Sequence, residues 1–432
     1  MWEFETDPAY QAELDWAAEF VREEVEPLEF VIPHILERDH PLWQALVPPL
    51  QQQVKDRGLW ATHLGPELGG PGHGQVKLAL LNEVLGAVPF SPIVFGCQAP
   101  DSGNAEILAH FGTEEHKANY LRPLLDGEMF SCFSMTEPQA GADPLEFTCS
   151  AELDGDEWVI NGEKWFASNA RYAEFIILMV VTEPDNPPYQ QHSMLIVPTS
   201  TPGVEIVRGV GHGGSDTHGQ GTHAYMRYSD ARVPAGNLLG GRGNAFVVAQ
   251  TRLGGGRIHH AMRTVGMARR ALDMMLERAV SRRTQGELLS RKQLVQEMVA
   301  ESWVELEQFR LLVLQTAWKI DRYHDYKRVR GDISAVKMAM PGVLNRIASR
   351  ALQVHGSLGV TEEMPFMSYL ANAYHLGLAD GPTEVHKTTL ARRLFSETTP
   401  AEGLWPSAHI PARRQAALAK YADVIARVGN TP

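Results

Sequence analysis

The sequence predicts an α+β protein in which an N-terminal helical domain and a middle β-sandwich or barrel precede a C-terminal four-helix bundle. Three observations predict it: helical spacing of apolar residues up to about residue 130, short β-rich runs up to about 240, and helical spacing again up to about 398. We divide the chain accordingly into domains at 1–130, 131–243 and 244–400, with a tail helix in 401–432.

The N-terminal zone begins with an amphipathic helix. Asp7 is placed to cap it, and Pro8 suits its first position because the missing N–H has no intrahelical partner there. The glycine- and proline-rich stretch LGPELGGPGHG at 64–74 then interrupts the helical pattern. Further helices are predicted over 75–85, 104–111 and 114–125.

The middle zone carries short β-rich runs with no helical stretch between them. Asp154-Gly155 and Asn161-Gly162 are tight-turn signals. Regularly spaced short strands of this kind are typical of a sandwich or barrel. The predicted strands are EFTCSAEL at 146–153, EWVINGEKWFA at 157–167, EFIILMVV at 174–181, HSMLIVP at 192–198, VEIVRGV at 204–210 and HAYMRYSDARVP at 223–234.

The C-terminal zone contains four long helical patterns with short connections, which is typical of a four-helix bundle. Breaks are expected near Gly286, 326–330 and 356–359. The predicted helices cover 244–283, 290–324, 330–356 and 364–397, with one more amphipathic stretch at 411–428 in the tail.

Composition narrows the class of protein. The chain has 432 residues and a formal charge of -13, and such an acidic balance disfavours nucleic-acid binding. Its 3 cysteines form no CxxC pattern, which indicates free thiols in a reducing compartment. The N-terminus shows no signal peptide, and the longest apolar run, FIILMVV, is too short to span a bilayer. We expect a cytoplasmic protein that binds neither nucleic acid nor a membrane.

Two patterns, a glycine-rich motif and a group of histidines, resemble functional sites but lack the neighbouring structure or spacing that such sites need. Residues 209–214 match GxGxxG, but no helix is predicted after them, so a loop between strands is favoured over a dinucleotide turn. His259 and His260 are adjacent and would point about 100° apart on a helix. The histidines of the glycine-rich loop, His212, His218 and His223, have no fixed ligand spacing, so no metal site is predicted.

Three segments carry residues suited to chemistry. The first, FSMTEPQAGAD at 133–143, offers a hydroxyl, backbone amides and small residues, and composition leaves a binding loop and an ordinary domain junction equally open. The second, NGEKWFASN at 161–169, delivers two aromatics and a hydroxyl after a turn, although aromatics are commonly core residues. In the third, LADGPTEVH at 378–386, a carboxylate stands at a helix break, where a surface turn is the commoner reading.

These segments, in this order, resemble the flavin-dependent acyl-CoA dehydrogenases, and the similarity covers residues 10–398. The subgroup is similar to the dehydrogenase half of family members ten and eleven, as GCQAPDSGN and ADGPTEVH indicate. The further matching pieces are PELGGPGHG at 66–74, HFGTEEHKANYLRPLLDGE at 110–128, MTEPQAGAD at 135–143, INGEKWFASNA at 160–170, the stretch 243–286, QVHGSLGV at 353–360 and LADGPTEVHKTTLARR at 378–393.

The resemblance implies that the chain binds FAD between the β domain and the bundle. Thr136 would bond the flavin edge, Phe166 would lie against its ring where the family usually has Trp, and Ser168 replaces a Thr near N5. The other implied cofactor-binding residues are Phe133, Met135, Gly141, Ala142 (Ser in most of the family), Arg282, Thr284, Gln293, Gln353, His355, Gly356, Ser357 and Glu384. Ala142, Arg257 and Gly381 would contact the acyl-CoA.

The resemblance also implies the base. The family usually has Glu where this chain has Asp380, and the place used by a few other members is here Gly256. Asp380 would take the α-proton of the thioester while the β-hydride passes to the flavin, and its backbone N–H would bond the thioester oxygen. We expect an apolar site to raise the pKa of this carboxyl.

The implied reaction is the oxidation of an acyl-CoA to the trans-2-enoyl-CoA in fatty acid β-oxidation, with electrons passed to an electron-transferring flavoprotein. The subgroup points to 4-hydroxyacyl-CoA or a phosphorylated derivative as the substrate. Two alternatives stay open, an acyl-CoA oxidase that uses O₂ and an inactive binding protein of the same fold. Because Arg282, Gln293 and Gln353 serve a neighbour's flavin in this family, a homodimer or homotetramer is expected.

Overall fold

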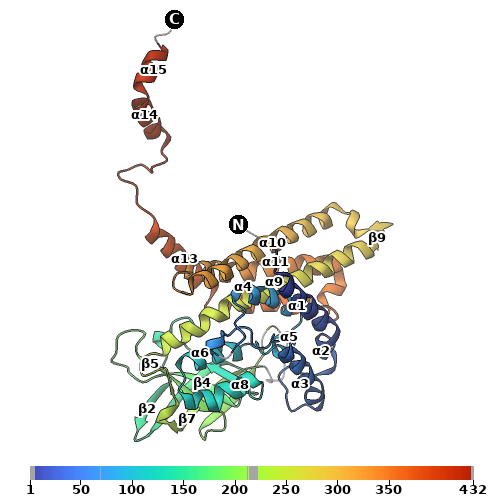
Figure 1. The fold of residues 1–432 in the computed structure, drawn as a ribbon, viewed down its shortest axis with the longest axis vertical. Coiled ribbons are helices and arrows are strands. Elements are labelled where there is room, and N and C mark those ends of the chain that lie inside the picture. The colour runs from blue at the N-terminus through green and yellow to red at the C-terminus, as the bar shows by residue number, and fades with distance from the viewer. Residues whose placement is uncertain (1–4, 69, 212, 214–221, 430–432) are drawn as a thin grey trace. The chain divides into compact units, whose positions relative to one another are not determined.

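The protein is described by a computed structural model over residues 5–68, 70–211, 213 and 222–429 (Figure 1). It forms two compact units, Met1–Lys387 and Thr388–Pro432. The first contains the helical and β regions predicted above, and the second contains the end of one helix and two short ones. The finer division of the chain into four domains stays a prediction.

The N-terminal zone is helical, as predicted, and it includes helices at 28–31, 41–56 and 91–94 that were not predicted individually. The Asp7 carboxylate accepts a hydrogen bond from the Ala9 N–H at 3.1 Å, which confirms the predicted cap. The predicted third helix begins as expected at Glu114 but passes through a π-helical turn, Lys117–Leu121, before α8. The helices are α1 (Pro8–Phe20), α2 (Leu28–Val31), α3 (Pro41–Asp56), α4 (Gln75–Leu85), α5 (Ser91–Val94), α6 (Asp101–Phe111), α7 (Glu114–His116) and α8 (Arg122–Asp126).

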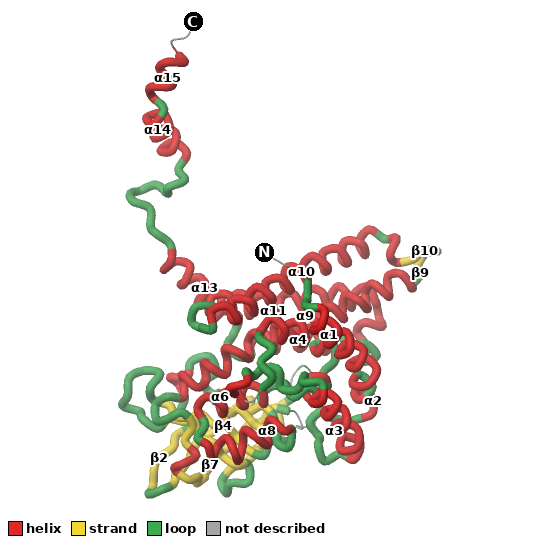
Figure 2. The backbone as a smooth tube through the Cα atoms, viewed as in Figure 1, coloured by secondary structure: helices red, strands yellow, loops and turns green. Residues whose placement is uncertain are grey.

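A single twisted sheet forms the β region, in the order β6-β7-β3-β1-β4-β5-β8, with β2 paired to β3 and β4. Figure 2 shows its strands gathered below the long helices. The central strand β1 (Ser131–Ser134) was not among the predicted strands, because all four residues are buried and give no alternation. The others are β2 (Ser150–Asp154), β3 (Glu157–Ser168), β4 (Phe175–Val181), β5 (His192–Pro198), β6 (Val204–Val210), β7 (His223–Pro234) and β8 (Leu238–Leu239).

The predicted bundle is present and is built around one long helix, α9 (Ala245–Ser281). A short hairpin of β9 (Arg283–Thr284) and β10 (Glu287–Leu288) joins α9 to α10 (Gln293–Tyr323). The fourth predicted helix is two helices, because Asp380-Gly381-Pro382 interrupts it. The remaining bundle helices are α11 (Arg330–His355), α12 (Phe366–Leu378) and α13 (Thr383–Glu397). The tail contains α14 (Ile410–Lys420) and α15 (Ala422–Gly429) rather than one helix.

Helices α4 and α9 cross so closely that two glycines are required at the crossing. A Cβ on Gly266 would lie 1.9 Å from the Glu83 carbonyl oxygen, and one on Gly86 would lie 2.0 Å from the Arg263 carbonyl oxygen. Both neighbours are backbone atoms, which cannot move without shifting a helix. The crossing therefore fixes the N-terminal helices against the bundle.

Two composition-based expectations can be checked on the described residues. Cys97, Cys132 and Cys149 are free, as predicted, and all three are buried. Within the described ranges, none of the helices combines the length and apolar character needed to cross a bilayer.

We predict that Gly266→Ala lowers the free energy of unfolding by about 3 kcal/mol, because the added methyl overlaps a backbone carbonyl. Gly377→Ala in α12 is the matched control, since its Cβ would find its nearest neighbour at an ordinary 3.6 Å. Alanine's higher helix propensity should leave the control neutral or stabilised by up to about 1 kcal/mol. Denaturant titration measures both, and equal midpoints for the two variants would contradict this account of the crossing.

Candidate active site

A buried ion pair holds the 133–143 loop against the sheet. Lys164 on β3 and Glu137 are 0% and 1% exposed, and the Lys164 Nζ donates to the Glu137 carboxylate at 2.8 Å. The same Nζ donates to the Met135 carbonyl at 2.7 Å. Glu137 also accepts from the backbone N–H groups of Thr148 and Cys149, at 2.7 and 2.9 Å. Although burial opposes its ionisation, these partners hold the pKa of Glu137 below its usual range.

The first two predicted segments meet beside this pair. Phe133 on β1 pairs with Ser168 on β3, and the Thr136 hydroxyl donates to the Trp165 carbonyl at 2.7 Å. Phe166 is 51% exposed and has a φ of 54°, a backbone conformation that a bulky residue rarely adopts. A strained backbone that holds a large aromatic side chain in solvent is an arrangement found at ligand sites.

Asp380 stands at the break between α12 and α13. Its φ is 56°, again in the left-handed region. The Arg257 Nε donates to the Asp380 carbonyl at 2.9 Å, so α9 fixes the backbone of the break. The next residue, Gly381, has a φ of 98° and lies beside the Arg257 guanidinium and the His386 ring. The structure thus brings together Asp380, Gly381 and Arg257, all predicted site residues.

The Asp380 carboxylate faces α9. It lies 3.5 Å from the His260 Nε2, and a Cβ built on Gly256 would lie 3.5 Å from its Oδ2. Burial raises the pKa of Asp380, but His260, Arg252, Arg257 and Lys337 together hold it below the ordinary value. The sequence-based expectation of a raised pKa is therefore wrong for this structure, because the site is rich in cations and not apolar.

The basic groups around Asp380 differ in charge state. Burial lowers the pKa of His260 to about 4, and burial together with nearby cations lowers that of His386 to about 4. Both rings are therefore neutral at pH 7. Burial lowers the pKa of Lys337 to about 8 against the opposing effect of Asp380, and this ammonium is 1% exposed and donates to the Leu376 carbonyl. Lys337 was not singled out from the sequence.

Arg252 joins the two halves of the site. Its guanidinium lies 3.8 Å from the centre of the Phe133 ring, and its Nε donates to the Asn104 side chain at 2.9 Å. A second link runs through His223 on β7, whose ring lies 6.3 Å from Phe166 and 5.6 Å from His375 on α12. The strained aromatic and the helix break therefore belong to one region.

Three consecutive glycines of α9 each make room for a different side chain. A Cβ on Gly254 would meet the Tyr326 ring at 3.5 Å, and one on Gly255 would lie 2.7 Å from the Glu106 carboxylate. Gly256 faces Asp380 in the same way. Each interior glycine costs a helix roughly 1 kcal/mol relative to alanine. Burial raises the pKa of Glu106 to about 8, so this carboxyl is largely protonated at pH 7. The glycine run was visible in the sequence and was the signal for this close approach.

Other predicted residues lie apart from this region. Arg282, Thr284 and Gln293 are exposed around the β9–β10 hairpin, at the far end of the 37-residue α9 (Figure 1). At 1.5 Å per residue that helix is about 55 Å long. At the end of α11 and just beyond it, Gln353, Gly356 and Ser357 are exposed, whereas His355 is 7% exposed with its Nδ1 2.8 Å from the Ala351 carbonyl. Gly141, Ala142 and Glu384 are also exposed.

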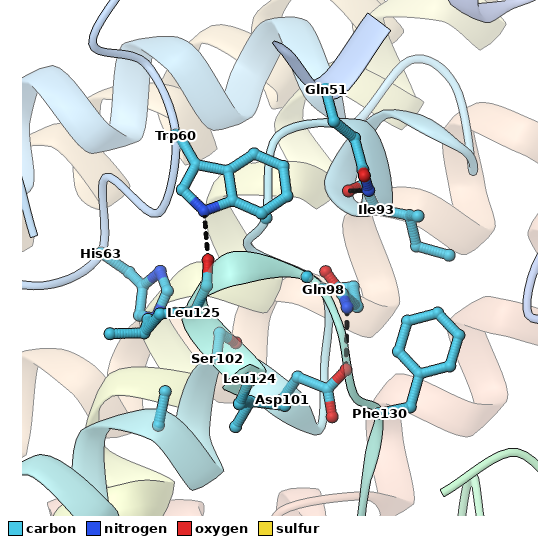
Figure 3. Close-up of a pocket in the computed structure, with 13 residues that line it drawn as sticks. Gln51, Trp60, His63, Ile93, Gln98, Asp101, Ser102, Leu124, Leu125 and Phe130 are labelled. Carbon is cyan, nitrogen blue, oxygen red and sulfur yellow. Dashed lines mark hydrogen bonds between the residues drawn. The ribbon is translucent and has the colours of Figure 1, made fainter. Parts of the chain in front are cut away.

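A small polar cavity lies between the N-terminal helices and α6 (Figure 3). It has room for about one water molecule. Gln98 donates to Asp101 across it, and burial raises the pKa of Asp101 to about 7. Burial lowers the pKa of the His63 ring to about 3, so this ring is neutral. The cavity is too small for an organic ligand.

Family models for the N-terminal, middle and C-terminal domains of acyl-CoA dehydrogenase match residues 8–128, 132–227 and 243–395. The chain belongs to the acyl-CoA dehydrogenase family. Enzymes of this family are FAD-dependent oxidoreductases, and the sequence-based recognition and fold class are confirmed.

Curated relatives give the same result. FadE2 of Mycobacterium tuberculosis is 40% identical over 91% of this chain and 93% of its own. Acyl-CoA dehydrogenase family member 11 of Gallus gallus is 41% identical over 79% of this chain. That match spans only 44% of the Gallus gallus protein, so the chain corresponds to less than half of its length.

Solved structures support the fold. A Mycobacterium abscessus protein assigned to this family is 34% identical, with a TM-score of 0.83 over 91% of this chain and 100% of its own. Butyryl-CoA dehydrogenase from Megasphaera elsdenii has a TM-score of 0.76 at 24% identity over 91% of this chain and 100% of its own, a likeness of fold alone.

We predict that Lys164→Met lowers the free energy of unfolding by about 3–5 kcal/mol, because Glu137 would remain buried without its cation. Arg232→Met, which removes exposed pairs with Asp154 and Glu157, is the control and should leave the unfolding midpoint close to that of the parent. Since the pKa of Glu137 is lowered in the fold, the pair's contribution is present above the unfolded carboxyl pKa and disappears as pH falls. Urea titrations at neutral and acid pH measure this, and a loss for Lys164→Met that persists unchanged at acid pH would contradict it.

Proposed function

We propose that the protein is an FAD-dependent acyl-CoA dehydrogenase that converts an acyl-CoA thioester to the trans-2-enoyl-CoA, with Asp380 as the base. One observation carries the proposal. A mostly buried, ionised carboxylate, 17% exposed, stands on a strained helix break opposite a glycine of α9. A carboxylate that is ionised at neutral pH can accept the α-proton of a thioester.

The residues around Phe166 fit a flavin. Its exposed ring offers an apolar face, the Thr136 hydroxyl keeps acceptor lone pairs beside it, and a Cβ on Gly141 would meet nothing within 4 Å. We propose that Phe133, Met135, Thr136, Phe166 and Ser168 hold the ring system and that Gly141 and Ala142 lie along its phosphates. When bound, FAD accepts the hydride that leaves the β-carbon of the acyl chain.

The break around Asp380 would also polarise the substrate. Arg257 holds the Asp380 carbonyl, so the Gly381 N–H, which belongs to the same planar peptide unit, is fixed in direction. An N–H aimed at the thioester oxygen would stabilise the enolate that forms as the α-proton leaves. Aspartate is one methylene shorter than the usual glutamate, and Gly256 compensates by letting the carboxylate lie close to the α9 backbone.

The charge of the site supports an anionic substituent on the acyl chain. Arg252, Arg257 and Lys337 are cations at pH 7, whereas Asp380 is an anion and His260 and His386 are neutral. Asp101, which also acts on Arg252, offsets part of this positive charge, and a bound anion would neutralise the rest. A 4-hydroxyacyl-CoA phosphorylated at the hydroxyl would bring such an anion.

Two further parts of the proposal concern partners. Because Arg282, Thr284 and Gln293 are exposed at the end of α9 remote from the sheet, they suit the diphosphate of a neighbouring copy's FAD, and we propose a homodimer or homotetramer. For the electrons we propose an electron-transferring flavoprotein. A structure titled as the electron transferring flavoprotein of Acidaminococcus fermentans contains a similar chain, 26% identical over 91% of this one and 99% of its own, with a TM-score of 0.76. Rapid reoxidation of the reduced enzyme in air would instead indicate an oxidase.

We predict that Asp380→Asn still binds FAD and acyl-CoA but slows flavin reduction by about 10³-fold, the scale expected for a lost base. Stopped-flow bleaching of the flavin by a panel of acyl-CoA thioesters measures the rate. Glu362→Gln, at an exposed carboxylate between α11 and α12, is the matched control and should reduce at the parent rate. Normal reduction by Asp380→Asn together with slow reduction by Glu384→Gln would mean that the base is Glu384.

We predict a pH dependence of flavin reduction that distinguishes the effect of an anionic acyl substituent from the effect of the base, Asp380. Because the pKa of Asp380 is lowered, reduction should show no acid limb down to about pH 5. Because the pKa of Lys337 is about 8, kcat/KM for a 4-phosphoacyl-CoA should fall above pH 8 as the ammonium loses its proton. The same profile with the unsubstituted acyl-CoA should stay flat there. Lys337→Met should abolish the alkaline limb, and an identical limb for both substrates would contradict the role of Lys337.

A further inference from the structure

The second unit of the chain, residues 388–432, carries an unusual surface for its size. We call it the C-terminal arm. Its helices α14 and α15 bury no residue, and they have 11 and 8 residues. Helices shorter than about 12–15 residues are marginal in water on their own. The arm therefore needs a binding surface to stabilise its helices.

The arm combines an apolar stripe with positive charge. Tyr421, just before α15, and Val424, Ile425 and Val428 within it recur at spacings of three and four residues, which places them on one face of that helix. All four side chains are about half exposed or more, at 51%, 47%, 48% and 69%. The arm holds six basic residues against three acidic ones, although the whole chain has a charge of -13. An amphipathic basic surface fits an acidic partner that has apolar side chains of its own.

The N-terminal helices present such a surface. Residues 5–40 contain eleven acidic residues and only two basic ones, and cations of other elements pair with three of the acids, Asp7, Glu13 and Glu26. Phe30 and Val31 on α2 are 79% and 49% exposed, and Leu42 on the following helix α3 is 43% exposed. Within the described residues, the exposed Glu19 and Glu24 form no ion pair. We call α1, the π turn after it, α2 and the start of α3 the acidic face.

We propose that the C-terminal arm of one copy of this chain docks on the acidic face of a second copy. The charges of the two surfaces are opposite, and each carries exposed apolar side chains that the contact would cover. In a homo-oligomer, each copy would bind the arm of a neighbouring copy, and this contact would stabilise α14 and α15. It is independent of the proposed reaction, because the acidic face and the arm contain none of the proposed site residues.

Amide hydrogen exchange of the full-length protein tests the docking directly. Peptides covering residues 410–429 should exchange at least about tenfold more slowly than the same peptides in Arg413→Glu/Arg414→Glu, because reversing two charges repels the acidic face. Glu19→Lys/Glu24→Lys should release the arm in the same way. The matched control is Lys117→Glu/Arg122→Glu, which changes the charge equally on a surface outside the acidic face and should leave the arm protected.

Mixed oligomers show whether the arm docks on the acidic face of a second copy or on the acidic face of its own chain. Co-expression of the Arg413→Glu/Arg414→Glu chain with the Glu19→Lys/Glu24→Lys chain restores both charge pairs only between copies, so protection should return in the mixed oligomer. A mixture in which the arms stay unprotected, while one chain carrying all four reversals is protected, would show docking on the chain's own body and overturn the proposal. Rapid exchange of the arm in the parent protein, or protection only with vesicles of phosphatidylcholine and phosphatidylserine in equal parts, would overturn it too.

Discussion

The position of helix α9 is the constraint on which the rest of the structure depends. Its arginines bind the parts of the chain that pack around it: Arg252 donates to Asn104 on α6, Arg263 to Asn82 on α4, and Arg269 to Glu83. Its glycines let α4 cross at backbone contact and let the Asp380 carboxylate approach its surface. One element thus aligns the N-terminal helices, the β sheet and the helix break, and an error in its path would displace all three.

The site also contains several features that are unfavourable for the free energy of folding. Phe166 and Asp380 both have positive φ, and Lys337, Lys164 and Glu137 are buried ionisable groups. Each of these features opposes folding when considered alone. Glu137 shows how such a cost is offset, because its carboxylate accepts hydrogen bonds from Gln139, Thr148, Cys149 and Lys164. The stability that the α9 core supplies is what allows a site of this kind.

Much of the fold followed from periodicity, and the failures have physical causes. Helix α4 and strands β4 to β7 were predicted with their bounds within a residue, since amphipathic or uniformly apolar runs end at clear turn signals. Strand β1 was missed because a fully buried four-residue strand has no periodic signal. The pKa of Asp380 was predicted in the wrong direction because His260, Arg252, Arg257 and Lys337 reach it from distant parts of the sequence. Individual roles for the predicted flavin residues stay predictions.

The placement of the Asp380 carboxylate depends on Gly256, so the roles of the two residues are linked. A shorter acidic side chain can act on a substrate only if its backbone or its opposing surface moves closer, and a glycine removes the side chain that would stand in the way. The same opening leaves the carboxylate beside His260 and within the field of Arg252, Arg257 and Lys337. Those cations lower its basicity, which would slow proton abstraction from a substrate that carries no anion on its acyl chain. A substrate that brings its own anion would neutralise them and restore basicity, so the charge of the site would couple the identity of the substituent to the strength of the base.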